Sequence, residues 1–256
     1  MIGAIAGDII GSPYEGFPIR RTDFPLFIAE SRPTDDSVLT VATAEALVRG
    51  KEYSVLYRDY FRSYPNAGYG GSFIRWGLGE VDSPYNSFGN GSAMRVSPVG
   101  WARETLGEVL NEARRSAAVT HNHPEGIRGA QAVAGALFLA RKGKQESEIR
   151  AWLSDAIGYR MDRTVDQIRP TYRFDITCQG SVPEALTCAL EANSFEEALR
   201  LAVSLGGDAD TQACIAGSVA EARFGVPGDI ATEALKRLPQ PLREVVDLFQ
   251  RSFRTG

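Results

Sequence analysis

Helical periodicity is the feature that most restricts the fold of this chain, because no long segment alternates polar and apolar residues with the period of two that strands require. Three segments have a strongly helical pattern. Residues 36–48 carry one charge after the first residue, residues 126–141 place apolar side chains on one stripe, and residues 208–224 place alanines on one face. These patterns predict three buried helices at the centre of the fold.

Weaker helical patterns cover much of the remaining chain, and glycine or proline separates them. They lie at 52–63, 71–79, 92–103, 106–119, 146–157, 182–192, 195–205, 229–237 and 241–253. No linker is long or polar enough to divide the chain, so residues 1–256 are expected to form a single domain. The sequence therefore predicts an all-α, compact single-domain bundle in which short helices pack around the central ones.

Charge and cysteine content exclude several classes of protein. A net charge of −4 and a pI near 5.4 give no basic field for nucleic acid, so no nucleic-acid groove is expected. Cys178, Cys188 and Cys214 are odd in number and lack metal-ligand spacing, which is typical of buried residues in a reducing compartment. The apolar start is interrupted by Asp8 and is too short for a signal peptide or membrane span, which favours a cytoplasmic protein.

Two acidic motifs stand where a polar loop gives way to an apolar helix, namely Thr34-Asp35-Asp36 and Asp208-Ala209-Asp210-Thr211. Each could simply cap a helix start. Both, however, carry more acid than a cap requires, include a threonine hydroxyl, and precede helices apolar enough to place the acids near the core. If the fold joins the two starts, the converging negative charges need hard divalent cations with oxygen ligands. The pair therefore predicts a two-metal site.

The N-terminal segment adds a third element. Glycines at positions 3, 7 and 11 line one face of a helix and would allow very close packing. Glu15 follows Asp8 by seven residues, nearly on the same stripe, although Pro13 weakens the helix between them. Glu15 is either a solvated loop acid or a further member of the acidic cluster.

Two glycine-rich loops precede helical segments, at Gly68-Tyr69-Gly70-Gly71-Ser72 and Ser87-Phe88-Gly89-Asn90-Gly91-Ser92. Backbone N–H groups at such junctions can hold phosphate oxygens, although each loop could equally be a turn. The only histidines are His121 and His123, and no HExxH motif or cysteine cluster supports zinc. His121 is either part of a helix-entry loop or a polar contact to a ligand hydroxyl or phosphate.

Five sequence blocks, in this order, resemble the ADP-ribosylglycohydrolase family. They are Gly7-Asp-Ile-Ile-Gly-Ser-Pro-Tyr-Glu15, Thr34-Asp-Asp-Ser37, Phe88-Gly-Asn-Gly-Ser-Ala-Met-Arg95, Thr120-His121 and Gly207-Asp-Ala-Asp-Thr211. The paired acidic motifs and the Phe88–Arg95 block are specific together, whereas the Thr-His pair is weak by itself. The resemblance implies an all-α orthogonal multi-helix bundle with a central cleft that holds two Mg²⁺ or Mn²⁺ ions and ADP-ribose.

The resemblance also implies roles for individual residues and a substrate class. The implied metal ligands are Thr34, Asp35, Asp36, Asp208, Asp210, Thr211 and Glu15. The implied substrate contacts are Gly68, Gly70, Gly71, Ser72, Ser87, Phe88, Gly89, Asn90, Gly91 and His121, with Phe88 offering an aromatic face. The partner would be an ADP-ribosylated protein or a small-molecule ADP-ribose conjugate, bound by a monomer.

A hydrolytic mechanism follows as a hypothesis. Glu15 and the four aspartates carry five negative charges, which nearly balance the four positive charges of two ions. A metal-activated water would attack the anomeric carbon of the distal ribose. Asp35 or Asp36 would orient and deprotonate that water, and Glu15 would manage the proton of the leaving group.

Three other functions are alternatives to an ADP-ribose-releasing hydrolase. The first is a catalytically silent ADP-ribose-binding or structural protein on the same fold. The second is a dimetal phosphohydrolase of ADP-ribose derivatives. The third is a diphosphate enzyme with a DDxxD motif, which the sequence disfavours because Ser37, Val38 and Leu39 follow Asp36.

Overall fold

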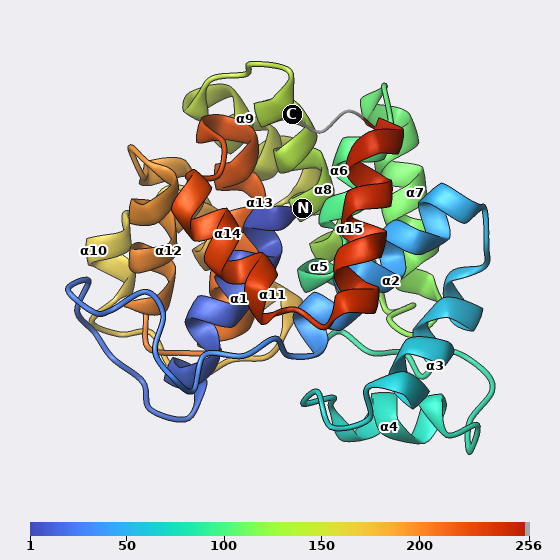
Figure 1. The fold of residues 1–256 in the computed structure, drawn as a ribbon. Helices are drawn as coiled ribbons and strands as arrows, with labels where there is room; N and C mark the ends of the chain where they lie inside the picture. The colour runs from blue at the N-terminus through green and yellow to red at the C-terminus, as the bar shows by residue number, and fades with distance from the viewer. Residues whose placement is uncertain (254–256) are drawn as a thin grey trace.

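The structure is a computed structural model that describes residues 1–253. Figure 1 shows a helical molecule, and within the described residues the only β-type pairing is one isolated bridge between Gly89 and Thr177. The helices are α1 (Ile2–Glu15), α2 (Asp35–Arg49), α3 (Tyr53–Ser63), α4 (Gly71–Gly77), α5 (Gly91–Met94), α6 (Ser97–Ala102), α7 (Leu106–Ala118), α8 (Pro124–Arg141), α9 (Glu146–Trp152), the π-helical turn η1 (Leu153–Ile157), α10 (Val165–Ile168), α11 (Cys178–Glu191), α12 (Phe195–Val203), α13 (Ala209–Phe224), α14 (Gly228–Arg237) and α15 (Gln240–Phe253). The all-α prediction is confirmed.

Most predicted helices lie within a few residues of their expected bounds, and the exceptions have local causes. The segment 92–103 forms two helices, α5 and α6, because Pro98 in the first turn of α6 has no N–H to continue the preceding helix. The segment 182–192 begins earlier, at Cys178, where the Thr177 hydroxyl accepts from the backbone N of Gly180 and caps α11. The short α10 was not expected from the sequence.

The α1 and α13 helices pack at very short range along the glycine face of α1. A methyl group added to Gly7 would lie 2.7 Å from the backbone N of Cys214, and one added to Gly11 would lie 2.6 Å from the Cα of Asp210. Any side chain at these positions would therefore force the two backbones apart. This contact fixes the position of α1 along the first turns of α13.

The helices α13 and α8 are rich in alanine and largely buried, and most of the helices that surround the core pack against one of them, including α1, α11 and α12 against α13 and α6 and α7 against α8. In Figure 1, α14 packs against α1 and α15 packs against α2, so that the C-terminal helices cover the core from one side. The three cysteines are buried and free, as expected. Among the described residues, no helix is both long enough and apolar enough to cross a membrane.

Candidate active site

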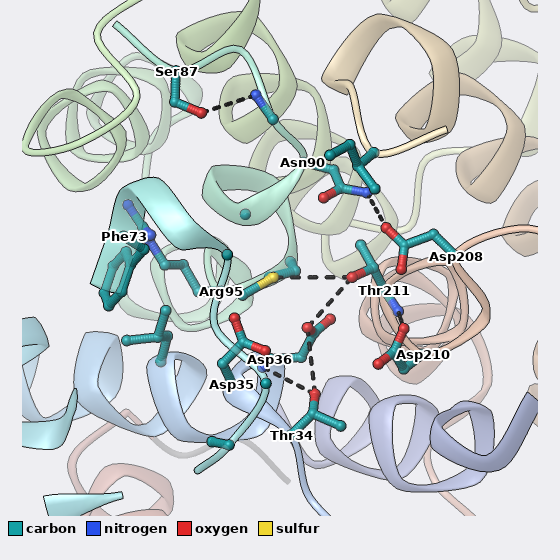
Figure 2. Close-up of a pocket in the computed structure, with 18 of the residues that line it drawn as sticks. Thr34, Asp35, Asp36, Phe73, Ser87, Asn90, Arg95, Asp208, Asp210 and Thr211 are labelled. Atoms are coloured by element: carbon teal, nitrogen blue, oxygen red, sulfur yellow. Dashed lines mark hydrogen bonds between the residues drawn. The ribbon is translucent and has the colours of Figure 1, made fainter. Parts of the chain in front are cut away.

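A cleft of about 380 Å³ opens where the end of α1 meets the first turns of α2 and α13. Figure 2 shows acidic side chains from α2 and from the start of α13 directed toward one another across this cleft. The lining residues are Glu15, Arg32, Thr34, Asp35, Asp36, Leu39, Ala67, Gly68, Gly70, Gly71, Ser72, Phe73, Tyr85, Ser87, Gly89, Asn90, Gly91, Met94, Arg95, His121, Ile176, Asp208, Asp210 and Thr211. The fold thus brings together both acidic motifs, both glycine-rich loops and His121.

Asp8 of α1 anchors the start of α2. Its carboxylate accepts hydrogen bonds from the backbone N of Thr34 (2.9 Å), the Thr34 hydroxyl (2.6 Å) and the backbone N of Ser37 (3.0 Å), and also from the Ser37 hydroxyl. The side chain is fully buried. Asp8 therefore ties the acidic turn of α2 to the helix that packs on α13, which sets the distance between the two motifs.

Asp36 lies at the centre of the cluster, between Thr34 and Thr211 in Figure 2. One carboxylate oxygen, Oδ2, is 3.3 Å from the Thr211 hydroxyl and 3.5 Å from the Thr34 hydroxyl. The other oxygen, Oδ1, is buried and has no hydrogen-bond partner among the described residues. An unpaired buried carboxylate oxygen is costly unless a cation or solvent binds it.

The start of α13 supplies the opposing acids. Gly206, with φ of +68°, makes the turn that leads into Asp208. Asn90 donates its side-chain N–H to Asp208 Oδ2 at 2.6 Å, and the backbone N of Thr211 donates to Asp210 Oδ1 at 2.8 Å. Asn90 therefore links the second glycine-rich loop to the acidic cluster.

Two groups of three acids have the spacing of a metal site. Asp8, Asp36 and Asp210 form one group, and Glu15, Asp208 and Asp210 form the other, with one oxygen from each member within 4.8 Å of the rest. Asp210 belongs to both. Carboxylate oxygens at this spacing suit a divalent cation, so the acidic residues of the cleft could hold metal.

The electrostatics of the cluster also favour a bound cation. Burial, followed by repulsion from the other acids, raises the pKa of Asp35 to about 7 and raises the pKa of Asp36 and Asp210 well above the usual value. Burial likewise raises the pKa of Asp208 to about 6, against hydrogen bonds from its neighbours. Without added positive charge these carboxyls resist ionisation, and a divalent cation would remove that penalty.

Asp35 lies on the cleft wall and is absent from the two three-acid groups, which include Asp8 instead. Its backbone N donates to the carbonyl of Ala67 at 2.9 Å, so the start of α2 is fixed to the first glycine-rich loop. Gly68, with φ of +113°, would bring an added methyl 3.3 Å from Asp35 Oδ1. The family resemblance implies a ligand role for Asp35, whereas it assigns no role to Asp8.

Phe88 is the one predicted site residue that does not line the cleft. Ser87 and Gly89 do line it, and in an extended segment the side chain between them points to the opposite side. The Phe88 ring lies 5.3 Å from the ring of His123, and its side chain is 45% exposed. The aromatic residues of the cleft wall are instead Phe73 and Tyr85.

Backbone hydrogen bonds fix the second glycine-rich loop to the segment that leads into α11. The backbone N of Asn90 donates to the carbonyl of Ile176, and the backbone N of Cys178 donates to the carbonyl of Phe88, both at 2.8 Å. Ser87 accepts from the backbone N of Gly89 at 3.1 Å, as Figure 2 shows. Ile176 thereby joins the cleft wall, and no local sequence pattern marks it for that position.

Comparison with known proteins identifies the family of this chain. The family model described as ADP-ribosylglycohydrolase matches residues 1–255. ADP-ribosylarginine hydrolase Tri1 of Pseudomonas putida (strain GB-1) is 28% identical over 260 residues, covering 89% of this chain and 70% of the relative. ADP-ribosylhydrolase ARH3 of Danio rerio is 24% identical, covering 97% of this chain and 89% of the relative.

The same fold occurs in a solved structure. A chain of an ADP-ribosylglycohydrolase-related protein complex superposes with a TM-score of 0.72 at 25% identity, covering 99% of this chain and 96% of that chain. The family model matches nearly the whole length of the chain, and the solved structure shares its fold. The chain therefore belongs to the ADP-ribosylglycohydrolase family, a family of enzymes that cleave the glycosidic bond of ADP-ribose.

Proposed function

We propose that this protein is a monomeric, single-domain, cytoplasmic hydrolase that releases ADP-ribose from a modified acceptor and requires two divalent cations, Mg²⁺ or Mn²⁺. The acceptor is a protein side chain such as arginine or serine, or a small-molecule conjugate. The observation that carries the proposal is the buried Oδ1 of Asp36, which has no hydrogen-bond partner within residues 1–253 and lies in a cluster of acids contributed by three helices. That arrangement is unfavourable for the folded protein unless it binds cations.

The members of the two three-acid groups that would hold the cations are Glu15, Asp36, Asp208 and Asp210, with the hydroxyls of Thr34 and Thr211 adjacent to Asp36. When bound, divalent cations neutralise the acids, orient ribose hydroxyls and lower the pKa of a bound water. Asp8 differs from Asp36, because both of its carboxylate oxygens already accept hydrogen bonds from Thr34 and Ser37. We assign it to positioning α2 and to the charge of the cluster.

The chain's own groups carry the proton transfers. Asp35 lies on the cleft wall and would take a proton from the water that attacks the anomeric carbon of the distal ribose. The new C–O bond forms as the bond to the acceptor breaks, and Glu15, which is exposed at the cleft, would pass a proton to the departing acceptor. The cleft is lined by Gly68, Gly70, Gly71, Ser72, Ser87, Gly89, Asn90 and Gly91 of the two glycine-rich loops, and these residues would hold the pyrophosphate and adenosine.

A panel of acceptors tests this function. Arginine-, serine- and nucleobase-linked ADP-ribose and O-acetyl-ADP-ribose are incubated with the protein in Mg²⁺, Mn²⁺ or EDTA, and the products are identified by mass spectrometry. We expect free ADP-ribose from at least one conjugate, only in the presence of the divalent ion. AMP or inorganic phosphate would instead indicate a phosphohydrolase, and cation binding without turnover of any conjugate would indicate a silent binding protein.

A further inference from the structure

Arg95 is a fully buried cation beside the cleft, and among residues 1–253 no carboxylate lies within ion-pair distance of it. Its guanidinium stacks over the Tyr57 ring at 4.3 Å. Nη2 donates to the Thr120 hydroxyl oxygen at 2.8 Å and to the carbonyl of Ser116 at 3.4 Å. Burying a charge in this way is costly, which indicates that Arg95 has a functional role.

Thr120 connects this cation to His121. The same Thr120 oxygen that accepts from Arg95 lies 2.7 Å from Nδ1 of His121. Both residues are buried, Thr120 completely. Burial and then the charge of Arg95 lower the pKa of His121 well below its usual value, so the imidazole is neutral near neutral pH. A neutral imidazole has one N–H, and its location depends on what Nδ1 faces.

The positive charge of Arg95 favours one tautomer of His121. If Thr120 accepts from Arg95 Nη2 and donates its only proton to Nδ1, a lone pair of the imidazole faces the cation and the Thr120 hydroxyl both accepts and donates a hydrogen bond. In the opposite arrangement an Nδ1–H dipole would point toward the cation, and the Thr120 proton would need another acceptor, such as the nearby Tyr85 hydroxyl. The first arrangement has the more favourable electrostatics and leaves the imidazole proton on Nε2.

Nε2 lies beside the second glycine-rich loop. A methyl group built on Gly91 would be 3.1 Å from Nε2, and one built on Gly89 would be 3.7 Å away. The absence of side chains at these two positions keeps open the space in front of Nε2, and both glycines line the cleft. An N–H here faces the volume in which the loop would hold ribose or phosphate oxygens.

We propose that Arg95, acting through the Thr120 hydroxyl, holds His121 as the neutral Nε2–H tautomer and so presents a fixed hydrogen-bond donor to an oxygen of bound ADP-ribose. Arg95 and Thr120 are positioning residues that act through His121, and His121 donates the hydrogen bond to the ligand. The identity of the ligand rests on the proposed function, whereas the tautomer is a property of the protein alone.

NMR measures the tautomer directly. The chain has only two histidines, so a His123→Asn variant leaves a single imidazole, and asparagine can replace His123 as the N-cap of α8. Long-range ¹H–¹⁵N correlation spectra of this variant, labelled at histidine, are expected to show protonated Nε2 and unprotonated Nδ1. A protonated Nδ1 would overturn the proposal.

A matched pair of substitutions tests the connection through Thr120. Thr120→Val keeps the shape but removes the hydroxyl, and Thr120→Ser keeps the hydroxyl. In the His123→Asn background we expect the valine variant to populate the Nδ1–H tautomer and the serine variant to retain the original one. An unchanged tautomer in the valine variant would show that Thr120 does not set it, and would overturn the proposal.

Binding then tests the donor role. The probe is ADP-ribose, titrated calorimetrically with Mg²⁺ present. Loss of one hydrogen bond predicts about five- to tenfold weaker binding by the Thr120→Val variant, with affinity restored in Thr120→Ser. Equal affinity in all three proteins would contradict the donor role. If the wild-type protein binds no ADP-ribose, the proposed function fails with the donor role, and the NMR result still decides whether Arg95 and Thr120 set the tautomer.

Discussion

At the scale of single residues, some carboxylate oxygens of the acidic cluster accept several hydrogen bonds, and others accept none from the described residues. Asp8 has four donors, whereas Asp36 Oδ1 has none among the described residues. The difference indicates that the two aspartates have different roles in the acidic cluster. Asp8 holds the turn of α2 in place, and Asp36 directs an oxygen at the space where positive charge is needed.

The first prediction concerns Asp36. Replacing it with asparagine keeps the shape but removes a charge, so we expect turnover to fall by about a thousandfold or more. In EDTA the variant should be at least as stable as the wild type, because it lacks a buried carboxylate whose pKa is raised. Initial rates and urea unfolding measure the two effects. Asp23→Asn, which alters an acid 81% exposed, is the control and should leave both unchanged.

The second prediction concerns Glu112, a buried acid that does not line the cleft. Burial acts to raise its pKa, but hydrogen bonds from Arg103 and Tyr53 outweigh burial and the pKa is lowered. Glu112→Gln should therefore destabilise the protein by about 1–3 kcal/mol at pH 7.

Because the folded-state pKa of Glu112 is lowered, its stabilising effect is present above the unfolded-state value near 4.5 and is lost as pH falls below it. The difference between wild type and variant should therefore shrink in urea unfolding below about pH 4. A difference that is constant with pH would contradict this account. Glu104→Gln is the control, since the pair of Glu104 with Lys142 is exposed and screened by solvent, so this substitution should change stability little at any pH.

At the scale of helices, the site depends on how closely α1 approaches α13. Three glycines on α1 allow the backbones to meet, and this contact carries Asp8 and Glu15 to the acids of α13. The packing of α1 on α13 therefore determines both the core and the positions of the acids in the cleft.

The third prediction follows from that contact. Gly7→Ala would place a methyl 2.7 Å from the backbone N of Cys214 and should destabilise the protein by about 3 kcal/mol, with weaker cation binding. Gly107→Ala is the matched control, since it alters a helical glycine with open space around it and should be neutral or slightly stabilising. Thermal unfolding with and without Mn²⁺ gives both quantities. Equal melting temperatures and equal cation binding in the two variants would show that the close approach of α1 to α13 does not determine stability or the site.

Local signals explain which elements the sequence could predict. The starts of α2 and α13 were predictable because caps and acids act within one turn, and the break between α5 and α6 was missed although Pro98 marks it. The role of Asp8 was not predictable, because its partners Thr34 and Ser37 belong to another helix. The orientation of Phe88 depends on the bridge between Gly89 and Thr177, which no local pattern reveals.

At the scale of the whole molecule, the acidic cluster should make stability depend on pH and on cations together. Asp35 and Asp208 have folded-state pKa values raised to about 7 and about 6 in the cation-free protein, with burial as the largest cause. Their carboxyls bind protons more tightly when folded. Raising the pH from about 4 to about 7 should therefore destabilise the cation-free protein.

The fourth prediction is that divalent cations reverse this loss. Binding to the folded state alone raises stability with cation concentration, and ionised acids bind more strongly than protonated ones. The increase in melting temperature caused by Mn²⁺ over EDTA should be larger at pH 7 than at pH 5. Calorimetric scans at both pH values test this, and an equal increase at the two values would contradict it.

The most direct test of the central claim is the number of Mn²⁺ ions bound by the wild-type protein and by the Asp36→Asn and Asp210→Asn variants, measured by equilibrium dialysis. The two aspartates come from α2 and α13 and meet in one three-acid group. We predict about two ions for the wild type and a loss of binding in each variant alone. Wild-type binding in both variants, or no binding by the wild type, would contradict a shared cation site.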